Sequence, residues 1–309
     1  MEKVNIIGGG IAGLGILGAV RNRGAIIKAG ALRRPSGEPL LSMEGEGLLG
    51  VSRPELLRLL DTAVHASVRR VVGRVDPLPD AGALTVGADG VNSVVRRDYW
   101  GKRSAAKPTP FLAVRGVVPG TPAPPEVGEY WGRGEIFGLA PAVGGSNWYA
   151  SFRSEWGPDR VDVAEALEVS RSRYANYSPA VQNVLALAHP ETSLAQRIWT
   201  TPPLATYSRG NVVLVGDAAH AMTPNLGRGA CEALIDAMTL GSLLNEHPMD
   251  KALAAYNKKR VMRTQLLRLA SSTMGSVALA RGAQPLRDAL FKQAGKRVAR
   301  TRERAGTSK

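Results

Sequence analysis

Three glycines near the start of the chain have the spacing of a turn that binds a dinucleotide. Gly8, Gly10 and Gly13, with Ala12 between the last two, follow the β-rich run Val4–Ile7 and precede apolar residues at helical spacing. Glycines allow a tight turn, and the free N–H groups at the start of the next helix can hold a pyrophosphate. The strand–turn–helix context predicts a dinucleotide site, with an ordinary glycine-rich turn as the alternative.

The partner that such a site usually has for ribose is missing. Ala25–Ile27 is predicted to form the second strand of the same unit, and an acid at its end would accept hydrogen bonds from the ribose hydroxyls. Lys28 stands there instead, and an ammonium group accepts no hydrogen bond. We therefore expect ribose binding to be weak or made by other contacts.

Two further motifs place an aspartate beside a glycine. Asp89 and Gly90 open the segment that ends at Arg96, and a plain Asp-Gly turn that caps a helix explains this pattern equally well. Gly216 and Asp217 follow a buried apolar strand and precede a proline, a glycine and a long helical pattern. This second arrangement has the form of a helix start that binds an anion.

Taken together and in this order, the three motifs resemble those of the class A flavoprotein monooxygenases, which have the para-hydroxybenzoate hydroxylase fold. The resemblance covers most of the chain. It implies an α/β fold with a Rossmann-like FAD/NAD(P)-binding domain, an inserted β-rich substrate domain and C-terminal helices. It also implies that NAD(P)H reduces non-covalently bound FAD and that O₂ adds at the flavin C4a. One oxygen atom would then hydroxylate or epoxidise an aromatic or other electron-rich molecule.

The resemblance implies a role for each matching residue. The first motif would hold the FAD pyrophosphate, and Asp89 would belong to a segment that touches the pyrophosphate and assists NAD(P)H. Asp217 would accept hydrogen bonds from ribitol hydroxyls, and the loop near Leu226 would present backbone N–H groups to the flavin N1/C2=O edge. Arg53 would contact FAD, with a solvated first-turn charge as the alternative. The full set of expected cofactor-binding residues is Gly8, Gly10, Ala12, Gly13, Arg53, Asp89, Gly90, Gly216, Asp217, Pro224, Leu226 and Gly227.

Five other residues could do chemistry, but each has a structural interpretation. His220 is predicted to be a hydrogen-bonded structural histidine rather than an acid or base, and Cys231 to be packed inside an apolar helix. Trp131, Trp148 and Tyr149 could line an aromatic substrate pocket or form the core of the β-rich domain. No side chain is identified as catalytic.

The patterns predict three parts that position these residues. Residues 1–98 and 199–250 are expected to form the FAD-binding domain, 99–198 the substrate domain, and 251–309 a basic helical segment. A Ser-capped helix is predicted after Ser52, and residues 30–51 are predicted to be loop. The other predicted strands are 83–86, 111–118, 134–139, 148–152 and 211–215, and the other predicted helices are 93–97, 163–169, 179–188, 226–244 and most of 251–309, with breaks at Gly275, Gly282 and Pro285.

Composition excludes several classes of protein. The chain has 309 residues, 44% of them apolar, and a formal charge of +14, which indicates a globular protein. One cysteine excludes a disulfide scaffold and a CxxC metal site, and the four scattered histidines lack the spacing of a histidine zinc site. Residues 251–309 carry a net charge of +13. We expect this segment to pack on the first domain, with binding to nucleic acid or an anionic membrane as the alternative.

The remaining expectations concern location, length and rival functions. Val4–Val20 is too rich in glycine for a signal peptide or a membrane span, so a cytoplasmic protein is expected. Only 61 positions separate Lys28 from Asp89, far fewer than in typical relatives, which predicts a shortened sheet and reduced stability.

The expected partners are a small, aromatic substrate and O₂. A reductase or impaired relative of the same fold, and a non-enzymatic binder through the basic C-terminus, stay as alternatives.

Overall fold

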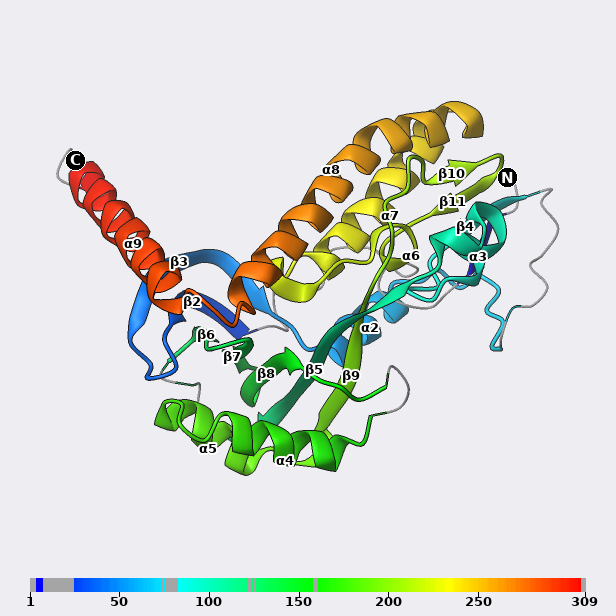
Figure 1. Ribbon diagram of the computed structural model, residues 1–309. Coiled ribbons are helices and arrows are strands. Elements are labelled where there is room, and N and C mark those ends of the chain that lie inside the picture. The colour runs from blue at the N-terminus through cyan, green and yellow to red at the C-terminus, as the bar shows by residue number, and fades with distance from the viewer. Residues whose placement is uncertain are drawn as a thin grey trace. The chain divides into compact units, whose positions relative to one another are not determined.

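The computed structural model describes residues 4–7, 25–73, 75, 83–121, 124, 126–157 and 161–306. The chain divides into two compact units, whose elements are labelled in Figure 1. Unit 1 consists of Met1–Val20, Arg53–Thr109 and Trp199–Gly275, and unit 2 of Arg21–Ser52, Pro110–Ile198 and Ser276–Lys309.

A four-stranded sheet of order β1-β4-β11-β10 forms the centre of unit 1. Strands β1 (Val4–Ile7), β4 (Leu84–Gly87) and β11 (Val212–Leu214) are parallel, and β10 (Ser208–Arg209) runs antiparallel to β11. All residues of β4 are buried, as its apolar sequence predicts for a central strand. At β1 the side chains of Val4 and Ile6 are 47% and 52% exposed. Among the described residues, β1 is therefore an uncovered edge.

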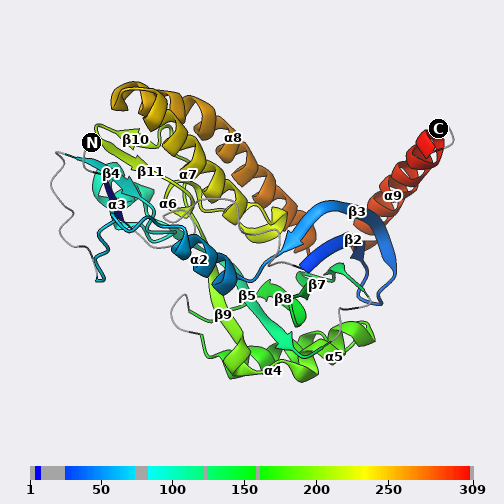
Figure 2. The ribbon, with the colours of Figure 1, turned by 180° about the vertical axis from the view of Figure 1, so that it is seen from behind.

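Helices complete the core of unit 1. They are α2 (Arg53–Thr62), α3 (Val94–Trp100), α6 (Asp217–His220), α7 (Gly229–Glu246) and α8 (Met249–Ala278) up to Gly275, with the short 3₁₀ helices η1 (Lys102–Ser104) and η3 (Pro224–Leu226). Figure 2 shows α7 and α8 side by side, and the Tyr256 hydroxyl on α8 donates to the Leu214 carbonyl of β11 over 3.1 Å. The helix continues through Gly275, where we predicted a break. A Cβ there would lie 2.6 Å from Asn225 Oδ1, so the glycine serves close packing.

Unit 2 is built on a seven-stranded sheet of order β3-β2-β6-β7-β8-β5-β9. The strands are β2 (Ala25–Arg33), β3 (Pro39–Gly50), β5 (Lys107–Pro119), β6 (Gly128–Trp131), β7 (Glu135–Ala142), β8 (Gly145–Arg153) and β9 (Ser193–Thr200). The prediction of loop for residues 30–51 is wrong, because β2 and β3 form a hairpin. Its turn is closed by the Arg34 amide donating to the Glu38 carbonyl over 2.9 Å, with Gly37 at a φ of 94°.

The predicted second strand of the FAD-binding domain belongs to another sheet. Strand β2 pairs antiparallel with β3 along most of its length and parallel with β6 at Ala31–Arg33, so both of its partner strands belong to unit 2. The pairing with β6 is close, since a Cβ on Gly128 would lie 1.8 Å from the Ala31 carbonyl oxygen. Lys28 is an exposed residue within β2 and does not end a strand beside β1. The structure thus groups residues 21–52 with unit 2, while the functional domain boundaries stay a prediction.

Aromatic side chains fill the core of unit 2. Phe137 and Trp148 stack with their ring centroids 5.9 Å apart, and Tyr174 meets Phe137 edge-on. Helices α4 (Val163–Arg173) and α5 (Pro179–Leu187) contribute Leu167, Val181 and other buried residues to the same cluster. The predicted strands and helices of this part of the chain are confirmed.

The last helix, α9 (Gln284–Gly306), belongs to unit 2. The Arg287 guanidinium donates to the Trp131 carbonyl over 3.0 Å, and Phe291 packs edge-on against the Trp131 ring. Lys292 Nζ lies 2.8 Å from a carboxylate oxygen of Glu38. Pro285, where we predicted a break, lies in the first turn of α9, because a proline at that position costs no helical hydrogen bond.

Replacing Trp148 by alanine should destabilise unit 2 severely. The side chain is fully buried, so Trp148→Ala should lower the free energy of unfolding by about 3–5 kcal/mol. Trp156, which is only partly buried at the border of the same cluster, provides the control, and Trp156→Ala should cost less. Urea denaturation followed by circular dichroism measures both. Equal losses for the two variants would contradict this assignment of the core.

Candidate functional site

The three sequence motifs follow three neighbouring parallel strands. Gly87, the last residue of β4, pairs with Ile7 of β1 on one side and with Leu214 of β11 on the other. The Ala88 amide donates to the Ile7 carbonyl over 2.7 Å, and the Val215 amide to the Gly87 carbonyl over 3.0 Å. The carboxyl ends of the strands therefore lie together, which is where ligands bind in open α/β sheets.

Asp89 caps helix α3 from the turn after β4. Its Oδ2 accepts hydrogen bonds from the amides of Val94 at 2.7 Å and Val95 at 3.2 Å. Gly90 has a φ of 77°, a conformation that favours glycine, so the interpretation of this motif as an Asp-Gly turn that caps a helix is confirmed. The other carboxylate oxygen, Oδ1, is buried and has no hydrogen-bond partner among the described residues.

Arg96 joins this turn to the Gly-Asp turn. The side chain is 1% exposed; its Nε donates to the Ser104 carbonyl and its Nη1 to the Ala218 carbonyl, both over 2.8 Å. Burial lowers the pKa of Arg96, and the nearby carboxylates of Asp89 and Asp217 oppose that shift. Nothing in the sequence separates Arg96 from the adjacent, exposed Arg97, so the sequence predicts no role for it.

Asp217 stands exposed at the first residue of α6, directly after β11. Gly216 has φ 58° and ψ −140°, which turns the chain sharply out of the sheet. The residues before it, Leu214 and Val215, are fully buried. The buried strand thus delivers a carboxylate to the surface at the carboxyl edge of the sheet.

The loop before α7 is held against α8. Ser271 Oγ donates to the Thr223 carbonyl over 2.6 Å. Pro224 and Leu226 are the ends of η3, and Gly227 follows with a φ of 61° and donates its amide to the Pro224 carbonyl over 2.8 Å. Helix α7 begins at Gly229, three residues later than predicted. Its 18 residues direct the positive end of a long helix dipole toward this loop.

A buried ionic network lies beneath both loops. Asp236 on α7 is fully buried and accepts the Gly216 amide at 2.8 Å and the Arg260 guanidinium at 2.6 Å. His220 Nε2 lies 2.6 Å from the same carboxylate. Burial alone would raise the pKa of Asp236, but the hydrogen bond and charge of His220, with the charge of Arg260, hold it below its ordinary value. His220 therefore has a structural partner, as predicted, at the end of α6 rather than in a loop.

The network continues to the loop before α7 through Glu232. This buried carboxylate accepts one hydrogen bond from Arg260 and one from Arg228, each at 2.6 Å. Burial would raise the pKa of Glu232, and the bonds from Arg228 and Arg260 outweigh burial and lower it. Arg228 follows Gly227 directly, so the α7–α8 pair fixes both loops. Asp236, Glu232 and Arg260 were not predicted as site residues, although charged residues among the apolar positions of two helices are a recognisable signal.

The other predicted site residues have different outcomes. Gly8, Gly10, Ala12 and Gly13 lie outside the described residues. Arg53 is the first residue of α2 and is exposed.

The prediction for Cys231 is wrong: its side chain is exposed, because it lies on the outer face of the first turn of α7. Within the described ranges, no three side chains of histidine, cysteine, aspartate and glutamate gather as metal ligands would. None of the helices in the same ranges has the length and apolarity to cross a membrane.

Of the three aromatic residues that were predicted to line a substrate pocket or form the core of unit 2, one lies in the core and two belong to a polar cluster. Trp148 is fully buried and belongs to the core. The Tyr149 hydroxyl donates to Glu129 Oε1, and Trp131 Nε1 donates to Glu129 Oε2 over 2.9 Å. Burial, together with the Glu129 charge, raises the pKa of Tyr149 well above its ordinary value, so this phenol stays protonated at neutral pH.

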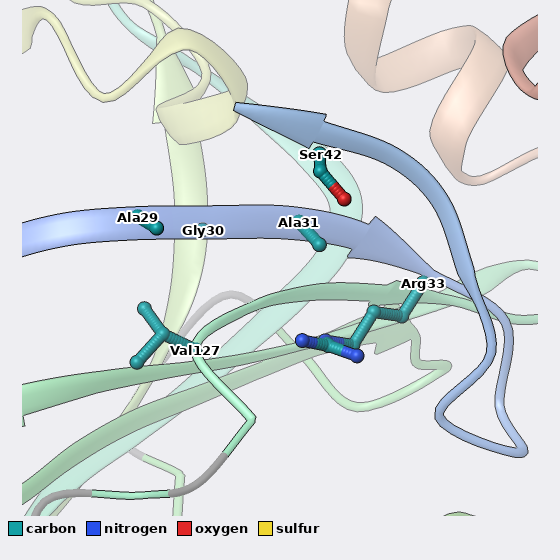
Figure 3. A pocket seen from close by; sticks show the side chains of 6 residues that line it. All are labelled: Ala29, Gly30, Ala31, Arg33, Ser42 and Val127. Carbon is teal, nitrogen blue, oxygen red and sulfur yellow. The ribbon is translucent and has the colours of Figure 1, made fainter. Parts of the chain in front are cut away.

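Unit 2 also contains a small hollow beside β2, shown in Figure 3. Its volume is about 300 Å³, and the Arg33 side chain points along it toward Val127. Arg33 Nη1 donates to the Gly37 carbonyl over 2.9 Å. The hollow contains none of the expected cofactor residues; its lining consists of Ala29, Gly30, Ala31, Arg33, Ser42 and Val127.

Comparison with known proteins agrees with the geometry of unit 1. The family described as "FAD binding domain" matches residues 80–269, which is more than half of the chain. The chain is 29% identical over 293 residues to the aurachin C monooxygenase/isomerase of Stigmatella aurantiaca, covering 85% of this chain and 75% of that protein. It is 33% identical over 220 residues to the 3-hydroxybenzoate 6-hydroxylase of Polaromonas naphthalenivorans, covering 66% of this chain and 52% of that protein.

The fold is similar to that of a solved flavoprotein. Klebsiella pneumoniae HpxO, complexed with FAD and uric acid, superposes with a TM-score of 0.80 at 22% identity, covering 96% of this chain and 94% of that chain. In sequence, the chain spans between about half and three quarters of the two curated relatives. The family match, together with the Asp-Gly and Gly-Asp turns that follow the adjacent parallel strands β4 and β11, leads to one conclusion: the chain belongs to the FAD-dependent aromatic monooxygenases, a family of flavoprotein oxidoreductases.

Proposed function

We propose that this chain binds FAD non-covalently at the carboxyl edge of the unit 1 sheet and uses NAD(P)H and O₂ to oxygenate a small aromatic molecule. One observation carries the proposal: three motifs of the expected kind follow three adjacent parallel strands. FAD, when bound, supplies the hydride acceptor and the site of O₂ activation. The protein supplies binding, orientation and charge.

The described residues have the chemistry that FAD needs. The exposed Asp217 carboxylate can accept hydrogen bonds from the ribitol hydroxyls, which a charged acceptor binds strongly. The buried Oδ1 of Asp89, which has no partner among the described residues, is a second acceptor at the same edge. The Gly227 amide is already bonded to the Pro224 carbonyl, so the first turn of α7 offers the free backbone N–H groups, and its positive helix end favours an anionic ring.

The buried network is the device that keeps these groups in place. Asp236 holds the amide of Gly216, and Arg228, through Glu232 and Arg260, ties the loop before α7 to the same two helices. Groups that must stabilise charge work best when they are fixed before the ligand arrives. We therefore assign Asp236 and Arg260 as positioning residues for the FAD site.

The proposed substrate is an aromatic ring with electron-donating substituents. The relative from Polaromonas is named for 3-hydroxybenzoate, a ring of this kind. An assay with a panel of such compounds identifies the one that is used.

A reductase or impaired relative of the same fold is the second candidate. The observation that favours it is the position of β2, which pairs within unit 2 and leaves Lys28 away from the end of a strand beside β1. Without a carboxylate there, the adenosine ribose has lost an expected acceptor. Such a protein would hold FAD through the flavin half alone.

The purified protein should carry FAD, and Asp217→Asn should weaken its binding. Loss of a charged acceptor for a hydroxyl is expected to raise the Kd about tenfold or more. Fluorescence titration of the flavin-free protein measures the Kd. Asp250→Asn, a change at an exposed carboxylate in the first turn of α8, is the control and should leave it unchanged. No binding by the wild type at tens of micromolar FAD, about 6 kcal/mol of affinity, would overturn the proposed function.

Isotope labelling separates a monooxygenase from a reductase. With NAD(P)H, ¹⁸O₂ and a panel of hydroxybenzoates and larger electron-rich aromatic compounds, we expect NAD(P)H consumption that one compound stimulates and a product that contains one ¹⁸O atom. Mass spectrometry detects the label. A reductase would consume NAD(P)H, return all the oxygen as hydrogen peroxide and leave every compound of the panel unlabelled.

Asp236→Asn should change how stability depends on pH. The folded-state pKa of Asp236 lies below its ordinary value of 3.8, so its ionised form stabilises the fold above that pH and the stabilisation is lost as the pH falls. The asparagine variant leaves the buried Arg260 with Glu232 as its remaining anionic partner, and the lost bond is expected to cost about 1–3 kcal/mol at neutral pH. Urea midpoints measured from neutral to acidic pH should fall less steeply for the variant. Parallel curves for the two proteins would contradict the role given to this carboxylate.

A further inference from the structure

One face of α8 carries three large apolar side chains in contact with solvent. Met262, Leu266 and Leu269 are 69%, 58% and 60% exposed. Their spacing of four and three residues places them on one stripe of the helix. We call these three residues the α8 stripe.

The fold of unit 1 does not use the α8 stripe. The opposite face of α8 packs into the core through Leu253 and Tyr256, and Arg260, Thr264 and Ser271 are buried on it as well. The expectation that the basic C-terminal segment packs on the first domain therefore holds for this inner face of α8. It is wrong for α9, which belongs to unit 2 and bonds to Trp131 and Glu38 there. Contiguous apolar surface that a fold leaves in water generally marks an interaction site.

Positive charge flanks the α8 stripe on its own helix, and one of these cations, Arg263, also lies 3.9 Å from the buried Glu232 carboxylate of α7. Lys258, Lys259 and Arg263 are exposed beside it. The sequence contains no aspartate or glutamate between Lys251 and Ala278. Arg260 is buried and bonded to Asp236 and Glu232, so it adds nothing to this surface. The face is thus apolar along its centre and cationic along its borders.

This combination selects among three kinds of partner. A second copy of the chain would bring the same lysines and arginines together, and like charges repel. A nucleic acid would satisfy the cations but would leave Met262, Leu266 and Leu269 in water. An anionic lipid surface satisfies both parts, because apolar side chains enter the acyl boundary while the cations meet the phosphates.

We propose that the α8 stripe and its flanking cations dock the protein reversibly on an anionic membrane surface. The inference does not depend on bound FAD, since it rests only on the outer face of one helix. It would place the protein where apolar aromatic compounds dissolve. Association through one short stripe is expected to be weak and salt-dependent, unlike that of a membrane-spanning helix.

Vesicle sedimentation with the full-length protein tests the proposal. We expect binding to phosphatidylcholine vesicles that contain phosphatidylglycerol, little binding to phosphatidylcholine alone, and release at high salt. The triple variant Met262→Ser/Leu266→Ser/Leu269→Ser should bind these vesicles at least about tenfold more weakly than the wild type. Lys258→Gln/Lys259→Gln should also bind more weakly and show a smaller dependence on salt.

A matched control removes three exposed apolar side chains elsewhere. Val143, Leu187 and Leu194 are 70%, 59% and 45% exposed in unit 2, and their triple serine variant should bind vesicles as the wild type does. Because the α8 stripe is exposed, its triple variant should keep the wild-type unfolding midpoint and FAD Kd. Lost binding in a variant that also unfolds early would be assigned to misfolding, and single substitutions at Leu266 would then replace the triple variant.

Three results would overturn the proposal. One is equal binding to neutral and anionic vesicles, and another is a triple variant that binds as tightly as the wild type. The third is a wild type that does not bind vesicles and is a dimer by light scattering, while the triple variant is a monomer. That last result would assign the α8 stripe to self-association.

Discussion

The carboxylate of Asp236 is the point on which the arrangement of unit 1 depends. It lies where no water reaches it, and a lone ionised carboxylate in that position would be very costly. Three donors make it tolerable: the Gly216 amide, His220 and the Arg260 guanidinium. Because each donor comes from a different segment, the same requirement that keeps the charge satisfied also fixes the end of β11, α6 and α8 relative to α7.

This constraint explains why the surface groups of the candidate site have fixed positions. The Asp217 carboxylate needs no hydrogen bond to be held in position. The Gly216 amide before it donates to Asp236, and the Ala218 carbonyl after it accepts from Arg96. The loop ending at Arg228 is fixed in the same way through Glu232. Buried charges thus orient exposed ones. The exposed carboxylate is then free to bind a ligand rather than hold the fold.

Sequence patterns predicted most of the elements and the position of the site, because both depend on local signals. Apolar runs identified β4 and β11, and glycines beside aspartates identified the turns that follow them. The pairing of β2 was not predictable in this way, since a β-rich run has the same appearance in either sheet. The close pairing of β2 with β6 depends on Gly128 and its neighbours, about 100 positions away in the sequence. Asp236 and Arg260 were missed for a related reason: the pairing of two buried charges 24 positions apart requires the packing of α7 on α8.

The placement of β2 changes what the FAD site can rely on. With β2 in unit 2, the described part of the unit 1 sheet ends at β1, so no described strand of that sheet beyond β1 brings a carboxylate for the adenosine ribose. The flavin half of the site keeps its acceptor, its loop and its helix end, all supported by the buried network. If the proposed function holds, affinity for FAD must therefore come mainly from the flavin half, and a change in the network should affect flavin binding more than it would in a relative with both halves intact.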